Sequence, residues 1–295
     1  MLEPLFAFDL AFTLFVQQFS STAFTLLMQA VSAVFSSAGV MAIVAWLYWS
    51  KREKESFYFA SLVVLAALFS QALKDFFQRP RPQFSQGIQG FEEHALKDFS
   101  FPSGHATIAG GVLGYLEKGL KANWKVLLLA FALLMAFSRI YLGAHFLTDV
   151  VAGLVLGFFV GKLNLWFRNR TEHMHFRLSK FREELLLFVF VIASVAIVLF
   201  LKELVLAAVI IGYFAGYSLW KELRKEQSRK GILAKIIGFA VLGALYIASE
   251  KTGVLALHYC ILLLMGFWVS FLYPWIFELF KHPSSKPKAR KGKRH

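Results

Sequence analysis

Long apolar runs separated by short polar or basic segments form the main pattern of the chain. A helix needs about 20 predominantly apolar residues to cross a bilayer, and several of these runs reach that length. The pattern predicts an all-α, polytopic membrane bundle of about nine transmembrane helices, near residues 23–49, 57–76, 103–116, 124–142, 145–163, 185–201, 204–220, 232–249 and 254–280. Pro274 marks an expected bend in the last of them.

The segment 5–19 is shorter than these runs and carries Asp9, Gln17 and Gln18 among its apolar residues. A short helix of this kind suits the membrane interface better than the bilayer interior, so we expect an interfacial N-terminal helix. A tilted first span is the alternative.

Changes in polarity divide the chain into four expected parts. Residues 1–163 form a five-span membrane domain that includes the interfacial helix, and residues 185–280 form an accessory region of four further spans. Residues 164–184 are strongly basic and are expected to be a cytoplasmic linker. Residues 281–295, rich in Lys, Pro and Ser, are expected to be a disordered tail.

Composition and the distribution of charge argue against a soluble globular protein and against a nucleic-acid-binding protein. With 58% hydrophobic and only 17% charged residues, the chain does not have the composition of a soluble globular protein. The net charge of +14 could indicate a nucleic-acid partner, but Lys and Arg lie in short loops between apolar runs. That distribution predicts that these loops and the C-terminus face the cytoplasm, and no nucleic-acid partner is expected. Compact loops favour a prokaryotic inner membrane.

Residues 138–149 read Ser-Arg-Ile-Tyr-Leu-Gly-Ala-His-Phe-Leu-Thr-Asp and lie between two apolar runs, at a membrane surface. Gly143 can turn the chain, and a helix that begins near His145 places His145 and Asp149 on one face. A carboxylate beside an imidazole fixes its tautomer and stabilises its protonated form. Arg139 offers a planar guanidinium suited to phosphate.

Two earlier polar segments supply further charges. Residues 74–82 read Lys-Asp-Phe-Phe-Gln-Arg-Pro-Arg-Pro, in which Lys74 and Arg81 are fixed cations. Residues 101–107 read Phe-Pro-Ser-Gly-His-Ala-Thr. With nine spans, the positive-inside rule places all three polar segments on the side away from the cytoplasm.

The second of these segments also opens a helix. Ser103 and Gly104 stand at its start, where free backbone N–H groups and the helix dipole favour an anion. His105 adds a second imidazole, without a carboxylate nearby in sequence. His145 is therefore the better nucleophile, and His105 suits a group that protonates a leaving oxygen and then activates water.

In order and spacing, the three segments resemble the signature of the type 2 phosphatidic acid phosphatase superfamily, whose members are membrane lipid phosphatases related to the vanadium haloperoxidases. The resemblance covers about the first half of the chain, to about Gly161. It implies catalysis by His145, His105 and Asp149 through a phosphohistidine, without a metal or other cofactor. The residues it implies for binding the phosphate are Lys74, Arg81, Ser103, Gly104 and Arg139.

Five residues near the signature are weaker candidates for the pocket: Gln71, Asp75, Arg79, Pro82 and Tyr141. For Arg79, a gating role and a solvent contact are equally open.

The resemblance implies a lipid phosphate or diphosphate as substrate, such as undecaprenyl diphosphate, phosphatidylglycerophosphate, phosphatidate or lipid A phosphate. Transfer of the phosphoryl group to another lipid uses the same intermediate, and a sugar phosphate is a further alternative. A transporter or scaffold is the alternative from another class, and a soluble-type vanadate-binding haloperoxidase is disfavoured by the spans. The oligomeric state stays open.

Small residues recur every four positions in the third and fifth predicted spans, a spacing that lets helices pack closely. They are Ala106, Gly110, Gly114, Gly153, Gly157 and Gly161. Packing of these two helices against each other would hold both imidazoles above one pocket, and packing against other helices is the alternative.

Overall fold

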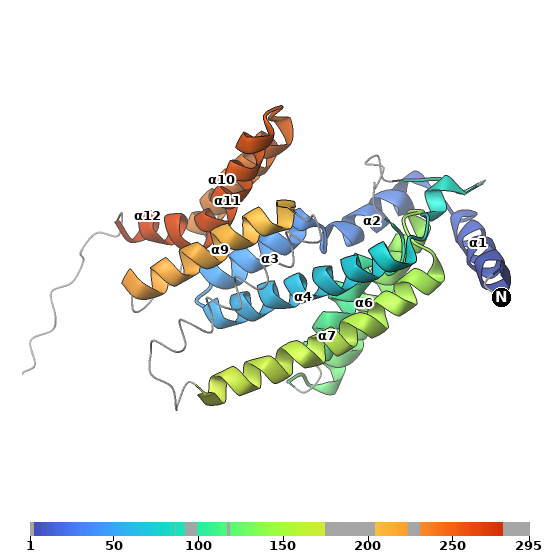
Figure 1. Ribbon diagram of the computed structural model, residues 1–295, viewed down its shortest axis with the longest axis horizontal. Helices are drawn as coiled ribbons and strands as arrows, with labels where there is room; N and C mark the ends of the chain where they lie inside the picture. Colours follow the sequence, from blue (N-terminus) through green and yellow to red (C-terminus); the bar gives the residue numbers. More distant parts are fainter. Residues whose placement is uncertain are drawn as a thin grey trace, which may run out of the picture. The chain divides into compact units, whose positions relative to one another are not determined.

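The structure, a computed structural model, describes residues 3–85, 87–91, 99–116, 119–174, 204–223 and 231–279. The regular elements in these ranges are helices, without a strand (Figure 1). The chain divides into two compact units, one formed by residues 1–48 and 52–207 and the other by residues 49–51 and 208–295. The predicted span at 185–201 and the tail at 281–295 lie outside the described residues.

The first unit holds the N-terminal helices and the three signature segments. Its elements in chain order are α1 (Glu3–Gln17), α2 (Thr22–Ala33), α3 (Ser37–Trp49), α4 (Glu53–Phe77), the 3-10 turn η1 (Pro82–Phe84), α5 (Gly104–Leu116), α6 (Ala122–Tyr141) and α7 (Leu147–Met174). The second unit holds α9 (Leu204–Leu223) from Ala208 onward, α10 (Ile232–Lys251), α11 (Leu255–Phe267), the π-helical turn η2 (Trp268–Leu272) and α12 (Tyr273–Leu279).

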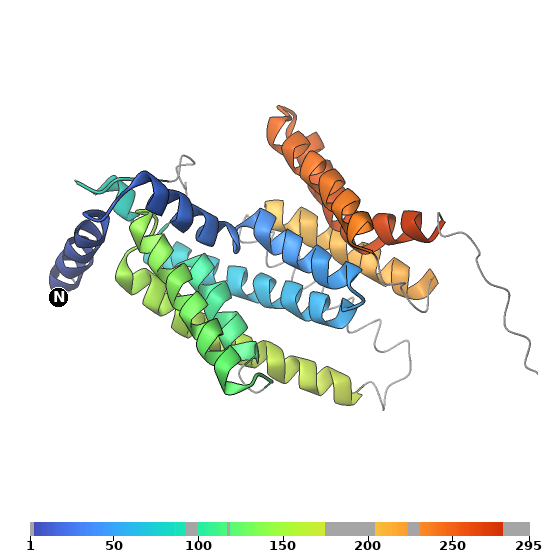
Figure 2. The ribbon, with the colours of Figure 1, turned by 180° about the vertical axis from the view of Figure 1, so that it is seen from behind.

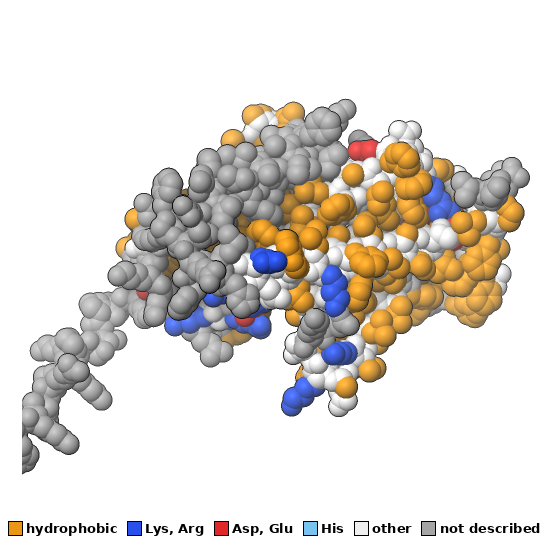
Figure 3. All heavy atoms as spheres, turned by 60° about the horizontal axis from the view of Figure 1, so that its bottom comes forward, with side chains coloured by type: hydrophobic (Ala, Val, Ile, Leu, Met, Phe, Trp, Pro, Cys, Tyr) orange, Lys and Arg blue, Asp and Glu red, His pale blue; other side chains and the backbone are white. Residues whose placement is uncertain are grey.

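Five helical segments of the described chain are long and apolar enough to cross a membrane, or six if the bent pair α2 and α3 forms one span. They are Glu53–Phe84, Ala122–Tyr141, Leu147–Arg170, Ile232–Lys251 and Leu255–Leu279. The chain is therefore a multi-pass membrane protein, and the total of nine spans stays a prediction. In accord with this, hydrophobic side chains cover much of the surface that Figure 3 presents.

The first predicted span, 23–49, is interrupted. Helices α2 and α3 meet at a bend of 52°. The Ser36 hydroxyl accepts the N–H of Gly39 at 3.2 Å and donates to the Ala33 carbonyl at 2.8 Å. A serine that caps a new helix in this way ends the preceding one, a local competition that hydropathy does not reveal.

Helix α5 packs along the first part of α7, and Figures 1 and 2 show them in one bundle with α4 and α6. A Cβ at Gly110 would overlap the Leu154 carbonyl oxygen, and one at Gly157 would overlap that of Thr107. The predicted packing of the small residues of these two helices on each other is thus confirmed. The starts of the two helices, which carry the signature residues, are held side by side.

The third and fifth predicted spans, 103–116 and 145–163, correspond to α5 and α7. Helix α5 has 13 residues, about 20 Å of helix, and it is not among the candidate spans. Helix α7 continues to Met174, beyond the predicted end at residue 163, so the first part of the expected basic linker is helical. The extension is stabilised because Arg168 donates to the Tyr115 hydroxyl at 2.8 Å and its guanidinium lies 5.3 Å from the Tyr58 ring.

The second unit also uses glycines for close packing. A Cβ at Gly212 in α9 would overlap the Leu263 carbonyl oxygen in α11. The predicted bend at Pro274 coincides with a change of hydrogen bonding, because η2 directly precedes α12, in which Pro274 is the second residue. Proline lacks an N–H and its ring displaces the carbonyl four residues earlier, which favours such a widened turn.

Candidate active site

His145 lies in a tight turn between α6 and α7. Gly143 has a φ of +72°, and a Cβ there would overlap the carbonyl oxygen of Gln89, so the turn requires glycine. The N–H groups of Ala144 and His145 both donate to the Arg139 carbonyl, at 3.1 and 3.2 Å. The turn leaves His145 only 2% exposed.

The hydrogen bonds of the His145 ring determine its tautomer. Nδ1 lies 2.8 Å from the carbonyl oxygen of Ser100, and because a carbonyl only accepts, Nδ1 carries the proton. Nε2 lies 3.2 Å from Nη1 of Arg81, and because a guanidinium only donates, Nε2 accepts. The neutral ring therefore holds the lone pair of Nε2 beside a fixed positive charge, as a nucleophile for phosphorus requires.

Asp149 reaches His145 through Ser100. Oδ2 of Asp149 is 3.9 Å from Nδ1 of His145, which is too long for a hydrogen bond. The Ser100 hydroxyl instead donates a short hydrogen bond to Oδ2, while the Ser100 carbonyl holds the ring. The expectation that the carboxylate itself fixes the tautomer is therefore wrong. His145 precedes the first turn of α7, so the two side chains do not share a helix face.

The other contacts of Asp149 connect it to α1. Its Oδ2 accepts the N–H of Phe146 at 2.8 Å, the contact by which a third helical residue caps its own helix. Its Oδ1 accepts from Nη1 of Arg79 at 2.7 Å. Nη2 of Arg79 donates to Oδ2 of Asp9 in α1, also at 2.7 Å. Arg79 thus joins two buried carboxylates, and because its own side chain is 19% exposed, the gating role and the solvent contact stay predictions.

Three buried cations surround His145. Arg81, Arg139 and Lys74 are 2%, 1% and 8% exposed. Burial holds the pKa of His145 well below its ordinary value of 6.5, and nearby charges lower this pKa further, in the order Arg81, Arg139, Lys74 and His105. The ring is therefore neutral near pH 7, and the surrounding positive charge suits a phosphate.

The start of α5 faces the same place. The N–H of Ser103 donates to the Asp149 carbonyl at 3.0 Å, which fixes the start of α5 against that of α7. A Cβ at Gly104 would meet no atom within 4 Å, so the space in front of this turn is open. His105 is half-buried, and it lies close enough to His145 that a positive charge on one ring would lower the pKa of the other. A half-buried imidazole can exchange a proton with a leaving group or with water.

The remaining pocket candidates have local partners instead. Gln71 donates to Asp75 at 3.1 Å on the exposed surface of α4. The buried Tyr141 hydroxyl lies 2.7 Å from that of Thr25, away from the histidines' hydrogen bonds. Pro82 is buried at the start of η1. Their roles in a pocket stay predictions.

Three residues of the site had no role in the prediction. Ser100 directly precedes the second signature segment, but its carbonyl contact involves a backbone atom that any residue supplies. Asp9 did carry a signal, since a carboxylate in the middle of an apolar helix needs a partner. Ser32 in α2 accepts a short hydrogen bond from Nη1 of Arg139, for which the sequence offers no signal.

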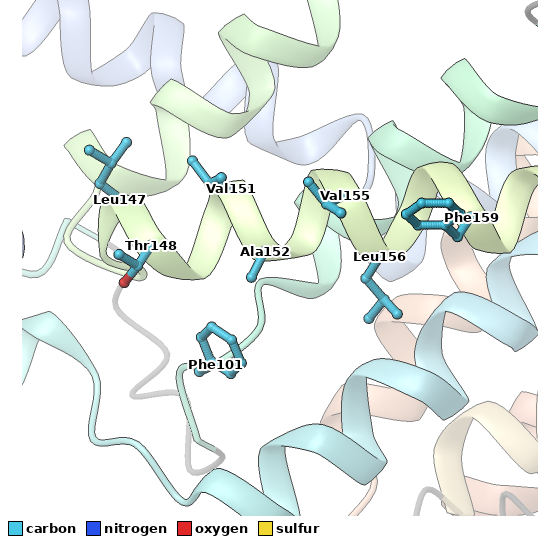
Figure 4. Close-up of a pocket in the computed structure, with 8 residues that line it drawn as sticks. All are labelled: Phe101, Leu147, Thr148, Val151, Ala152, Val155, Leu156 and Phe159. Carbon is cyan, nitrogen blue, oxygen red and sulfur yellow. The ribbon is translucent and has the colours of Figure 1, made fainter. Parts of the chain in front are cut away.

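An apolar groove of about 680 Å³ begins beside this network and follows α7 (Figure 4). It is lined by Phe101, Leu147, Thr148, Val151, Ala152, Val155, Leu156 and Phe159. Its polar end is Thr148, whose Oγ1 accepts from Nη1 of Arg79 at 2.6 Å. From Leu147 to Phe159 the groove follows about 18 Å of helix.

Comparison with protein families agrees with this arrangement. The model of the PAP2 superfamily matches residues 55–172, which contain all three signature segments. A second model, PAP2 superfamily phosphatase, transmembrane extension, matches residues 204–286. The chain contains a PAP2 superfamily domain. The second match assigns the accessory helices, for which the sequence suggested no motif, to the same superfamily.

Two curated relatives of this PAP2 chain come from Bacillus subtilis. Undecaprenyl-diphosphatase BcrC is 29% identical over 42% of this chain and 64% of its own length. Phosphatidylglycerophosphatase B is 35% identical over 30% of this chain and 46% of its own length, so the match spans less than two thirds of either relative. Among solved structures, the crystal structure of Aquifex aeolicus LpxE has a TM-score of 0.47 at 24% identity, over 53% of this chain and 93% of that one.

Proposed function

We propose that this PAP2 superfamily member is an integral-membrane phosphatase that hydrolyses the phosphate or diphosphate headgroup of a lipid. The observation that carries the proposal is the environment of His145. Its Nδ1 is bound by a carbonyl, and its Nε2 lies 3.2 Å from Arg81 within a group of buried cations. The two curated relatives are named as phosphatases of lipid substrates, which supports the same class here.

In the first step, Nε2 of His145 attacks phosphorus and the bond from phosphorus to the leaving oxygen breaks. His105 gives its proton to that oxygen, so the lipid leaves as an alcohol or, from a diphosphate, as a monophosphate. The phosphoryl group then lies on Nε2, and the ring carries a positive charge. The Asp149 carboxylate, connected through Ser100, favours that charge.

In the second step, His105 accepts a proton from water, and the water oxygen attacks phosphorus as the bond to Nε2 breaks. Inorganic phosphate leaves and both histidines return to their starting states. Lys74, Arg81 and Arg139 neutralise the phosphate in both steps, the electrostatic role that phosphoryl transfer requires. No metal or other cofactor has a role in this mechanism.

The apolar groove on α7 supports a lipid as the carrier of the phosphate. Its lining is apolar apart from Thr148, and all the lining residues except Phe101 lie in the candidate span Leu147–Arg170. A hydrocarbon chain in this groove would stay in the bilayer while its headgroup reaches the histidines. The positive-inside pattern favours a site on the extracytoplasmic side of a prokaryotic inner membrane.

A substrate panel tests the proposal. Purified protein in detergent, with EDTA present, is given undecaprenyl diphosphate, phosphatidylglycerophosphate, phosphatidate, lipid A phosphate and a soluble sugar phosphate, and released phosphate is measured. We expect release from at least one lipid and none from the His145→Ala variant. Release from the sugar phosphate alone would contradict a lipid substrate, and activity that needs added magnesium would contradict the metal-free mechanism. If the substrate is labelled in its phosphate, transfer of that label to an acceptor lipid would identify a phosphotransferase.

A further inference from the structure

Helix α1 contributes a buried carboxylate to the ion network of the site. Asp9 is 0% exposed. It accepts from Nη2 of Arg79 at 2.7 Å and from the Thr148 N–H at 3.1 Å, and the Thr148 hydroxyl donates to it in a short hydrogen bond. Asp9 lies outside residues 55–172, the range of the PAP2 match, so its contribution is not part of the family signature.

Arg79 is divided between two carboxylates. Nη1 contacts Asp149 and Nη2 contacts Asp9, each at 2.7 Å. With all three groups ionised, their charges sum to minus one. Without Asp9 the guanidinium would neutralise Asp149, and the Ser100–His145 pair would lie beside a neutral ion pair. With Asp9 present, the network keeps a net negative charge next to a ring that becomes positive when Nε2 bonds to phosphorus.

We propose that Asp9 is a positioning residue of the phosphatase centre, which acts on His145 through Arg79, Asp149 and Ser100. Asp9 preserves the net negative charge of the network that it forms with Arg79 and Asp149. Helix α1 thereby contributes a residue to the active site. This inference rests on the proposed function, because it assigns Asp9 a role in that reaction.

The charge of the network can be changed in steps by three variants. Asp9→Asn raises the network charge from minus one to zero. Arg79→Gln lowers it to minus two. The double variant Asp9→Asn/Arg79→Gln returns it to minus one. The titratable and charged groups that act on His145 are otherwise the same in all three: Lys74, Arg81, Arg139, His105 and Asp149.

The readout is the titration of His145, followed by NMR of protein labelled at histidine Cε1 and assigned with His145→Gln. Inorganic phosphate is added because its charge offsets the surrounding cations. We expect the titration midpoint to fall by roughly 0.5 pH unit in Asp9→Asn and to rise by a similar amount in Arg79→Gln. In the double variant it should return close to the wild-type value. If the midpoint of His145 shifts in the same direction in both single variants, or in neither, the proposal is overturned. A purely structural role of Asp9 would not make the shift follow the sign of the charge change.

Activity gives a second, separate readout. Asp9→Asn should lower kcat by about tenfold with little change in KM, because it weakens a charge that acts only as the phosphohistidine forms. Thr13→Val is the matched control: Thr13 is also buried in α1, but its hydroxyl donates only to the Asp9 carbonyl, at 2.8 Å. Its kcat and the midpoint of His145 should stay at the wild-type values, and equal losses in both variants would refute the role of the charge.

Two further outcomes keep the inference separate from the proposed function. If wild-type protein releases phosphate from no lipid, the proposed function fails, while the opposite shifts of His145 still test the network. If Asp9→Asn does not fold, Arg79→Gln must still raise the midpoint, and Asp9→Glu must leave it unchanged because it keeps the charge. A midpoint that does not rise in Arg79→Gln would then refute the inference.

Discussion

The carbonyl oxygen of Ser100 lies 2.8 Å from Nδ1 of His145, and this contact holds the ring in the tautomer whose lone pair lies on Nε2. The hydroxyl of the same residue donates to Asp149. One serine therefore performs two tasks with different atoms. A side-chain substitution removes the second task and keeps the first.

Ser100→Ala should lower kcat by about 10- to 100-fold and leave KM nearly unchanged. The variant loses a hydrogen bond to a carboxylate, which contributes about 1.5–3 kcal/mol, but the ring stays oriented by the backbone. Steady-state kinetics on the preferred lipid of the panel measures the effect. Ser249→Ala is the control, because Ser249 is also buried but its hydroxyl bonds only the Tyr246 carbonyl in its own helix. A kcat for Ser100→Ala equal to that of the control would show that Asp149 does not act through the hydroxyl.

Substitution of the two histidines should block different steps of the reaction. His145→Ala lacks the nucleophile, so it should form no covalent intermediate and show no turnover. His105→Ala keeps the nucleophile but cannot activate water, so we expect a phosphoenzyme that can be trapped. Protein incubated with substrate labelled in its terminal phosphate is quenched in base, in which phosphohistidine survives, and bound label is counted. Label retained by His145→Ala would show that the roles are assigned to the wrong histidines.

The depressed pKa of His145 predicts a pH profile. Burial and three cations keep the free ring neutral to well below pH 6.5, so the acid limb of kcat/KM that belongs to His145 should lie below that value. Arg81→Gln removes the largest of the charges that lower this pKa, and the limb should move to higher pH. Comparison of the two proteins on one substrate cancels the titration of the substrate itself. A limb that stays in place in the variant would contradict the assignment.

The same shift has a consequence for stability. The pKa of His145 is lower in the folded protein than the value of about 6.5 expected after unfolding. Below that value the unfolded chain binds more protons than the folded one, so the free energy of unfolding decreases as the pH falls. In His145→Gln this part of the pH dependence should be absent from thermal unfolding curves.

Much of the fold followed from hydrophobic length alone, because a helix that crosses a bilayer must be long and apolar. Helices α4, α6 and α7 lie where such runs predicted them. The small residues of α5 and α7 showed that both helices pack closely with a neighbour. They could not show that the neighbour of each is the other, since many apolar faces accept a glycine.

The residues of the site were easier to predict from the sequence than the contacts between them. The signature identifies His145 and Asp149, but the two are joined by Ser100, which lies 45 residues before His145 in sequence. Asp9 and Arg79 are 70 residues apart, and they meet where α1 packs against α6 and α7. Periodicity within one segment carries no information about such partners, although a carboxylate in an apolar helix does indicate that one exists.

Close packing of α5 and α7 gives a mutational test. In Gly157→Ala the new Cβ would overlap the Thr107 carbonyl oxygen, so the helices must separate. We expect a loss of about 1–3 kcal/mol in stability and a lower kcat, because the same contact aligns the helices that begin at Gly104 and Leu147. Gly243→Ala is the control, since no atom lies within 4 Å of its Cβ, and it should be neutral or slightly stabilising. Thermal unfolding in detergent and kcat are measured for both, and equal behaviour would show that α5 and α7 tolerate separation.

The length and the charges of α7 predict the side of the membrane on which the site lies. Helix α7 has 28 residues, about 42 Å of helix, so its two ends lie on opposite sides of a hydrocarbon core about 30 Å thick. The histidines are at its start, and the basic residues that follow residue 161 are at its end. The excess of Lys and Arg predicts that the end faces the cytoplasm and the start faces outward. A cysteine at the exposed Gln89, whose backbone is hydrogen-bonded to the Gln17 side chain, should therefore react with a membrane-impermeant thiol reagent in intact cells. A cysteine at the exposed Asn169 should react only after the membrane is opened, both in a Cys260→Ser background that removes the native thiol. The reverse pattern would place the histidines in the cytoplasm, and the substrate would then have to be a lipid of the inner leaflet.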